Sequence, residues 1–244
     1  MEAIADLPHE TSKARRFLHS YFGRIRVALI LIVVISSCIW WPVFVEYQKE
    51  DRIAQEIWNA GGSVGREGRL LYRRIHTVEL SNCKNPGGLP KDINELRHLQ
   101  QLDLTWSLIT DADLEYLRGL DKLETLLLSR TQVSDSGLEN LKGLTKLRDL
   151  DLSHTQISDA GLEHLKGMNI RRLDLWGTAV TEAGLEHLKG LPNLTSLTFV
   201  NMQISNAGLE HLKSMTNLKR LMFKTTPSNL ADLQEALPNC TFSP

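Results

Sequence analysis

Apolar residues recur along most of the chain with one spacing, at positions 1, 4 and 6 of a short segment. The segments begin at intervals of 24, 24, 24, 23, 24 and 24 residues, at Ile75, Leu99, Leu123, Leu147, Ile170, Leu194 and Leu218. Because the last two apolar positions alternate with polar ones, each unit predicts a short strand with one buried face. The fixed period predicts that the units stack and bury a continuous core.

The rest of each unit predicts a turn and a short helix. In the middle copies it reads T-x-[IV]-[ST]-[DE]-x-G-L-x-x-L-x-x-[LM], and leucines three apart, such as Leu162 and Leu165, are predicted to face the core. A hydroxyl residue, followed by an acidic residue or in one copy by Asn206, is predicted to be the helix N-cap, at Thr110, Ser134, Ser158, Thr181 and Ser205. Glycines are predicted to end the helices, at Gly143, Gly167 and Gly190.

A different apolar pattern, without this period, precedes the repeats. Residues 27–45 are 19 uncharged residues. As a helix they would extend roughly 28 Å, close to the hydrocarbon thickness of a bilayer. Trp40, Trp41 and Tyr47 suit the interface at its end. The sequence predicts an uncleaved transmembrane helix, with processing at Cys38 of "ISSC" as a lipoprotein left as the alternative.

Charges on the two sides of this segment differ. Basic residues precede it, at Lys13, Arg15, Arg16, Arg24 and Arg26. Mainly acidic residues follow it, at Glu46, Glu50, Asp51 and Glu56, against Lys49 and Arg52. The positive-inside rule therefore predicts a cytoplasmic N-terminus and repeats on the non-cytoplasmic side of the membrane. With the opposite orientation, the repeats would form a cytosolic adaptor tethered to the membrane.

These patterns divide the chain into five predicted segments. They are a short arm (1–26), the transmembrane helix (27–45), a helix with an N-terminal cap (46–74), seven repeats (75–226) and a C-terminal cap (227–244). Within residues 46–74, Ile53, Ile57 and Ala60 share a helical face that ends at Gly61, and a strand or coil should then cover the open end of the stack. The C-terminal cap predicts a closing helix and an extended stub.

The repeats resemble the leucine-rich repeat family, and more narrowly a bacterial version with T-x-[IV]-[ST]-D-x-G-L-x-x-L, often found on membrane-anchored proteins. The resemblance implies an α/β solenoid with a parallel β-sheet on a concave face, short helices on a convex face, and protein–protein recognition. It also implies that one position in each repeat carries a side chain that hydrogen-bonds to loop backbone. In this chain that position is occupied by Cys83, Ser107, Thr131, Thr155, Thr178, Met202 and Thr226. Since Met202 cannot make that bond, we expect the sixth turn to be irregular.

Composition excludes several classes of function. The 28 basic and 29 acidic residues nearly cancel, which argues against a nucleic-acid partner. Cys83 and Cys240 belong to opposite ends of the stack, about 30 Å apart at the spacing of neighbouring strands, so they cannot form a disulfide. No cysteine or histidine spacing matches a zinc site, and no cofactor is expected.

Two groups of residues are candidates for a metal site or a catalytic site. His164, His187 and His211 recur on neighbouring repeats, but the same position holds Tyr116 and Asn140 elsewhere, so we interpret them as repeat consensus on solvated helices. Asp151 and Asp174 form a carboxylate pair without a nucleophile or an orienting group. The sequence has no phosphate-binding loop, GxSxG or HExxH motif. We therefore predict neither an enzyme nor a metal protein.

The strand positions that point away from the core predict a binding face. Alternation places three acids in one central column, at Asp103, Asp151 and Asp174. Trp176 is an exposed aromatic of the kind that dominates interfaces, with Arg172 beside it and His154, Trp106 and Arg130 at the rim. We predict that a protein partner or cell-envelope component contacts six of these residues: Asp103, Asp151, His154, Arg172, Asp174 and Trp176. The sequences "LDLS" and "LDLT" are common in such repeats, so the column of acids can be repeat consensus without a ligand. A structural, weakly self-associating envelope protein is therefore the alternative.

Overall fold

The computed structural model describes residues 43–67, 74–83, 88–199, 204–223 and 230–243. The chain divides into two compact units, Met1–Gln48 and Lys49–Pro244, and the described residues of the first unit, 43–48, are helical. Within the described ranges, none of the helices combines the length and apolar character that crossing a membrane requires. The predicted arm and Cys38 lie outside these ranges, as does the predicted transmembrane segment except for its last three residues.

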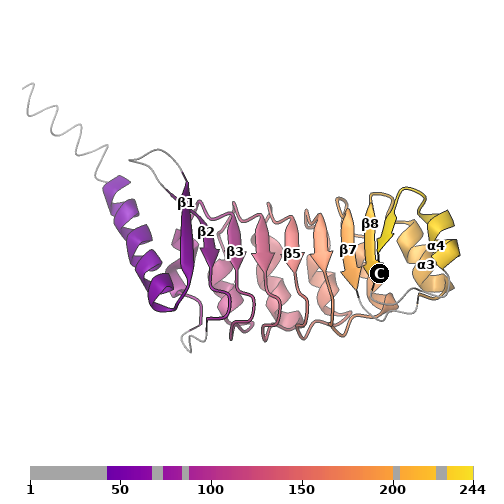
Figure 1. Ribbon diagram of the computed structural model, residues 1–244, viewed down its shortest axis with the longest axis horizontal. Helices are drawn as coiled ribbons and strands as arrows, with labels where there is room; N and C mark the ends of the chain where they lie inside the picture. Colours follow the sequence, from indigo (N-terminus) through magenta and orange to yellow (C-terminus); the bar gives the residue numbers. More distant parts are fainter. Residues whose placement is uncertain (1–42, 68–73, 84–87, 200–203, 224–229, 244) are drawn as a thin grey trace, which may run out of the picture. The chain divides into compact units, whose positions relative to one another are not determined.

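The strands of the second unit form one sheet in chain order (Figure 1). They are β1 (Ser63–Glu67), β2 (Arg74–Glu79), β3 (Gln101–Asp103), β4 (Thr125–Leu127), β5 (Asp149–Asp151), β6 (Arg172–Asp174), β7 (Ser196–Phe199), β8 (Arg220–Phe223) and β9 (Thr241–Ser243). From β2 to β9 all described pairs are parallel, which confirms the prediction. The exception is β1, which pairs antiparallel with β2 at the edge of the sheet.

Short helices cover one face of this sheet, behind the strands in Figure 1. They are the 3₁₀-helices η1 (Lys91–Glu95), η2 (Asp113–Leu117), η3 (Asp135–Gly143), η4 (Gly161–Leu165) and η5 (Glu182–Gly184), and the α-helices α2 (Leu185–Leu188), α3 (Asn206–Lys213) and α4 (Leu230–Ala236). Most are 3₁₀-helices because each repeat leaves only a few residues between its turn and the next strand.

A single apolar cluster runs through all repeats. The residue that begins each repeat is fully buried, as are Leu162 and Leu165 from the helical side. Each repeat therefore covers the apolar edge of the next, as the period predicts. At the C-terminal end, α4 and β9 confirm the predicted helix and stub. There burial raises the pKa of the Cys240 thiol to about 11, and the thiol makes no disulfide.

A ladder of hydroxyl groups fixes the turn after each strand. Ser107, Thr131 and Thr178 each donate from the hydroxyl to the carbonyl three residues earlier, at 2.5, 2.7 and 2.7 Å, and Thr155 makes the same bond to Leu152. This confirms the expected backbone contact at these positions. The expected irregularity at Met202 lies outside the described residues.

A second ladder joins neighbouring repeats through the [ST]-[DE] pair. The carboxylate of Asp135 accepts hydrogen bonds from the backbone N–H and the hydroxyl of Ser158 in the next repeat, at 2.7 and 2.6 Å. The same two bonds join three other pairs: Asp111 to Ser134, Asp159 to Thr181, and Glu182 to Ser205. The acidic residue thus connects repeats in addition to preceding a helix.

These bonds correct the predicted N-caps. Thr181 and Ser205 do cap their helices, by accepting from the N–H groups of Ala183 and Ala207. The hydroxyls of Thr110, Ser134 and Ser158 make no such cap bond, and each donates to an aspartate. Thr181 and Ser205 also donate to the acid of the preceding repeat, so one hydroxyl can make both bonds, while Ser134 occupies the N-cap position of η3 without a side-chain cap bond.

The glycine of the same motif makes room for this ladder. A Cβ atom on Gly161 would lie 2.3 Å from Oδ1 of Asp135, and one on Gly184 would lie 2.4 Å from Oδ1 of Asp159. Any larger residue would displace the carboxylate that bonds the next repeat. The glycine is therefore required by a neighbouring side chain, since its own φ is not positive.

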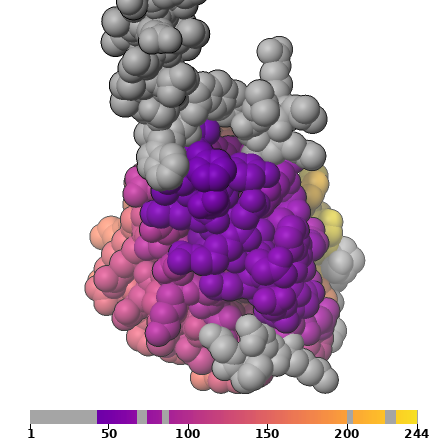
Figure 2. Space-filling view, turned by 90° about the vertical axis from the view of Figure 1, so that its left-hand side faces the viewer, coloured from indigo at the N-terminus to yellow at the C-terminus, as the bar shows by residue number. Residues whose placement is uncertain are grey.

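The predicted N-terminal helix and cap are present. The helix ends at residue 59, and Ile53 and Ile57 are fully buried in the core of the second unit. Gly61 has a φ of +89°, and Gly62 donates to the carbonyl of Ile57, an end of the Schellman type. Figure 2 faces this end, where the indigo surface of the cap lies over the magenta repeats.

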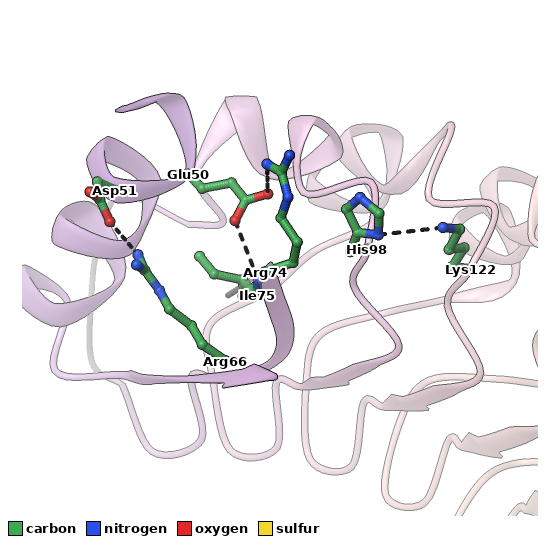
Figure 3. Close-up of polar contacts among 7 residues, drawn as sticks. All are labelled: Glu50, Asp51, Arg66, Arg74, Ile75, His98 and Lys122. Atoms are coloured by element: carbon green, nitrogen blue, oxygen red, sulfur yellow. Dashed lines mark hydrogen bonds and ion pairs between the residues drawn. The ribbon is translucent and has the colours of Figure 1, made fainter. Parts of the chain in front are cut away.

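One buried carboxylate ties the helix to the first repeat (Figure 3). Glu50 is only 2% exposed, and it accepts from Arg74 Nη1 at 3.1 Å and from the Ile75 N–H at 3.3 Å. Asp51 forms a second ion pair with Arg66 of β1. The cap is therefore held by charge as well as by apolar burial.

We predict that Gly161→Ala lowers the free energy of unfolding by about 2 kcal/mol, because the added methyl group displaces Asp135 from Ser158. Gly143→Ala is the matched control, since a Cβ there meets nothing within 4 Å. Urea unfolding followed by circular dichroism gives both values. Equal effects at the two glycines would contradict the steric explanation.

We predict that Glu50→Ala lowers the free energy of unfolding by about 3 kcal/mol, because it removes the buried carboxylate that accepts from the partly buried Arg74 guanidinium and from the Ile75 N–H. Glu56→Ala, on the exposed side of the same helix, should change it by less than about 0.5 kcal/mol. The same urea titration measures both, and a small loss for Glu50→Ala would show that the pair is dispensable.

Candidate binding face

The register of the sheet brings the predicted acids into one column. Asp103 pairs with Leu127, Leu127 with Asp151, and Asp151 with Asp174. This central column continues through Thr198 and Met222. The predicted column is therefore confirmed, with Leu127 separating Asp103 from the adjacent pair on β5 and β6.

Each of these acids also closes the turn that follows its strand. Oδ1 accepts from the backbone N–H two residues later, from Thr105 to Asp103, Ser153 to Asp151, and Trp176 to Asp174, at 2.9, 2.8 and 2.9 Å. The recurring "LDL" wording thus has a local structural role. That role needs one oxygen acceptor and does not need a negative charge.

Asp174 differs from an ordinary turn residue in its surroundings. Burial raises its pKa above the usual aspartate value, and the nearby charge of Asp151 adds to the increase. The N–H of Trp176 and the ring of His154 act in the opposite direction without cancelling it. The ionised carboxylate is therefore held in an unfavourable site, where a neutral acceptor would be more stable.

Arg172 is held by an acid that the sequence prediction missed. Its Nε and Nη2 atoms donate to the two carboxylate oxygens of Asp149, at 2.6 and 2.5 Å. Asp149 and Arg172 are direct partners on β5 and β6. The signal was present in the sequence, since the two residues occupy the same position of consecutive repeats.

A row of three side chains lies at the rim, just past β3, β4 and β5. The guanidinium of Arg130 lies 4.2 Å from the ring centre of Trp106, and its Nη2 lies 3.3 Å from Nε2 of His154. All three residues have positive φ angles, between 54° and 59°. The row ends at Gly177, where a Cβ atom would lie 2.6 Å from Nδ1 of His154. This rim row is a preformed, partly aromatic surface.

The predicted site residues gather in part. An open hollow of about 430 Å³ lies on the face and includes Asp151, Arg172 and Asp174 in its lining. Trp176 lies beyond it at the strand ends and is 39% exposed, as predicted for an anchor. His154 belongs to the rim row, and Asp103 lies two strands away from Asp151.

Charge is unevenly distributed over this face. Acidic side chains occupy the strands from β2 to β6, at Glu79, Asp103, Asp149, Asp151 and Asp174. Basic side chains occupy β6 and β8, at Arg172 and Arg220. A partner that lies across the strands therefore meets opposite charge at its two ends.

The histidine row supplies no metal site in the described part of the chain. His164, His187 and His211 are partly buried on the helical side, and no group of three or more His, Cys, Asp or Glu side chains among the described residues could hold a metal ion.

Comparison with known proteins supports the repeat assignment. Residues 97–157 match the family described as "Leucine rich repeat". No curated protein matches the chain. Among solved structures, an internalin (inlF) of Listeria monocytogenes has a TM-score of 0.50 and 20% identity, over 81% of this chain and 54% of that one. At this identity the likeness shows the fold alone, and this chain spans about half of that protein.

Two further solved structures are similar at lower scores. Internalin C2 (inlC2) of Listeria monocytogenes has 23% identity and a TM-score of 0.48, over 80% of this chain and 93% of that one. The PEPR1–AtPEP1 complex has 20% identity and a TM-score of 0.44, over 70% of this chain and 24% of that one.

We predict that Asp174→Asn raises the melting temperature at pH 7, because asparagine keeps the acceptor for Trp176 and removes the buried charge. The native pKa is raised, so the penalty of the ionised wild-type group is present above that pKa and disappears as pH falls to the ordinary value of about 3.9. The gain should shrink accordingly in melting curves recorded from pH 7 to acid. A gain that does not change with pH would contradict the charge explanation.

Proposed function

We propose that the chain is a membrane-anchored, non-enzymatic interaction module of the leucine-rich repeat type that recognises a protein partner through the strand face. Repeat solenoids present extended surfaces suited to this purpose. The anchor is the apolar segment at residues 27–45, and its flanking charges support display of the repeats on the non-cytoplasmic side.

The observation that carries this proposal is the pair formed by Asp174 and Trp176. Burial raises the pKa of Asp174, so its charge costs stability, and Trp176 leaves an indole ring exposed two residues later. Groups that are unfavourable for the fold concentrate at functional sites. An exposed aromatic beside such a charge supports a contact with a partner, which would cover the ring and supply a counter-charge.

The openness of the face supports binding and not catalysis. The hollow over β3–β8 is lined by acids, Arg172 and Arg220 without a nucleophile positioned by a base. The rim row offers a second surface at the same strand ends, where an aromatic ring, a guanidinium and an imidazole are held in line.

We predict that Trp176→Ala combined with Asp174→Asn abolishes capture of a partner by the full-length chain from envelope extract solubilised in a non-ionic detergent. The change removes the anchor ring and the charge while keeping the turn acceptor. Trp58→Ala is the matched control, because Trp58 is also an exposed tryptophan (49%, against 39% for Trp176) and lies on the N-terminal helix. Quantitative mass spectrometry of the captured proteins measures the outcome.

A partner held by wild type and Trp58→Ala but lost by the double variant supports the proposed face. A partner retained by the double variant would place recognition elsewhere. Recovery of the bait chain alone would favour the self-associating envelope protein.

A further inference from the structure

A second hollow, of about 760 Å³, lies at the starts of the strands in the C-terminal repeats. Among the described residues, four cationic side chains and no acidic side chain line it; the basic members are Arg171, Arg172, Lys219 and Arg220. The remaining members are amides and hydroxyls, at Asn193, Thr195, Ser196, Asn217, Asn239 and Thr241. We call this surface the basic hollow.

The repeat register gives the basic hollow its order. Arg172 on β6 pairs with Ser196 on β7, and Ser196 pairs with Arg220 on β8. Arg171 and Lys219 precede Arg172 and Arg220 by one residue. A strand that carries hydroxyls is therefore flanked on both sides by two cations. Two strand spacings separate the flanks, roughly 9.6 Å, a width that admits a carboxylate between guanidinium groups.

Three of the four cations have no acid to neutralise them. Arg172 is paired with Asp149, but the side chains of Arg171, Lys219 and Arg220 are exposed and make no hydrogen bond or ion pair to the residues that the structure describes. The chain as a whole is almost neutral. The positive charge at this place is thus local, and it produces an attractive field for an anion.

The basic hollow is continuous with the face proposed to bind the partner. Arg172, Ser196 and Arg220 line both this hollow and the one that contains Asp151 and Asp174. Resting on the proposed function, we infer that the partner presents an acidic peptide segment, whose carboxylates lie over Thr195 and Ser196 between the two cationic pairs. The neighbouring part of that partner then meets Asp151, Asp174 and Trp176 with basic or aromatic groups.

The shape of the hollow favours a peptide over a small ion. Its cations are exposed and lie at β6 and β8, on either side of β7, so one phosphate-sized group would reach only part of them. Several carboxylates along an extended chain, with side chains on alternate sides, match this distribution.

The test measures binding of rhodamine-labelled hexaglutamate to the full-length chain in non-ionic detergent by fluorescence anisotropy. We expect saturable binding that weakens as the salt concentration rises, and at least about a tenfold loss of affinity with Lys219→Glu and Arg220→Glu together. Lys166→Glu with Lys189→Glu is the matched control, because it makes the same change in net charge on the helical side. Hexaglutamine is the control peptide.

Each contrary result overturns the inference. Equal losses in the two charge-reversal variants would show non-specific attraction. Binding of tripolyphosphate but not hexaglutamate would identify a phosphate ligand in place of a peptide. Absence of hexaglutamate binding, or equal binding of hexaglutamine, would remove the carboxylate contact. Neutral variants, Lys219→Gln with Arg220→Gln, check that loss does not follow from repulsion introduced by glutamate.

The outcome is separable from that of the proposed function. Hexaglutamate binding that depends on Lys219 and Arg220 supports the hollow even where Trp176→Ala leaves partner capture unchanged. If Trp176→Ala abolishes partner capture and hexaglutamate does not bind, the strand face is supported as the binding surface. The inference that the partner presents an acidic segment is then overturned.

Discussion

Every parallel strand pairs with its neighbour at the same position of the repeat, and this fixed register is the constraint on which the other features depend. It aligns the buried leucines into one core, the hydroxyls into a turn ladder, and each Asp or Glu with the Ser or Thr of the next repeat. The single 23-residue interval between repeats shows how strictly this register is maintained. Asp149 still pairs with Arg172, so the missing residue is absorbed in the connection around Gly167, whose φ is +79°, and the strands keep their alignment.

The same register turns differences between repeats into a surface. Core positions must stay apolar, and the glycine of the motif is required by the acid of the preceding repeat. Side chains on the strand face have no such requirement, so their identities can vary at fixed geometry. Asp149 beside Arg172, Asp151 beside Asp174, and the row from Trp106 to His154 all arise in this way. Binding specificity is therefore set where the repeat pattern is least strict.

Periodicity sufficed to predict the strands, the buried leucines, the column of acids and both caps. It failed where a side chain bonds to another repeat and not to its own. Ser134 and Ser158 look like N-caps within one repeat, but their hydroxyls donate to Asp111 and Asp135 of the repeat before and make no cap bond. The ion pair of Arg172 with Asp149 was missed, because it joins side chains of two consecutive repeats. The sequence pattern did not predict the basic hollow, because Arg171 and Lys219 precede the strands and lie outside the alternation that was used to define the face.

The acids of the central column can be repeat consensus and binding groups at once, and their neighbours separate the two roles. The turn after β4 has Leu127 in place of an acid, yet Arg130 adopts the same positive φ as Trp106 and His154. The backbone conformation therefore does not depend on a carboxylate. Where an acceptor is useful, asparagine would provide it without charge. The turn thus explains an oxygen at Asp174 but not the partly buried negative charge beside Asp151. Under the proposed function, a cationic or hydrogen-bond-donating partner would account for that charge, since binding would relieve in the complex what the fold alone leaves unfavourable.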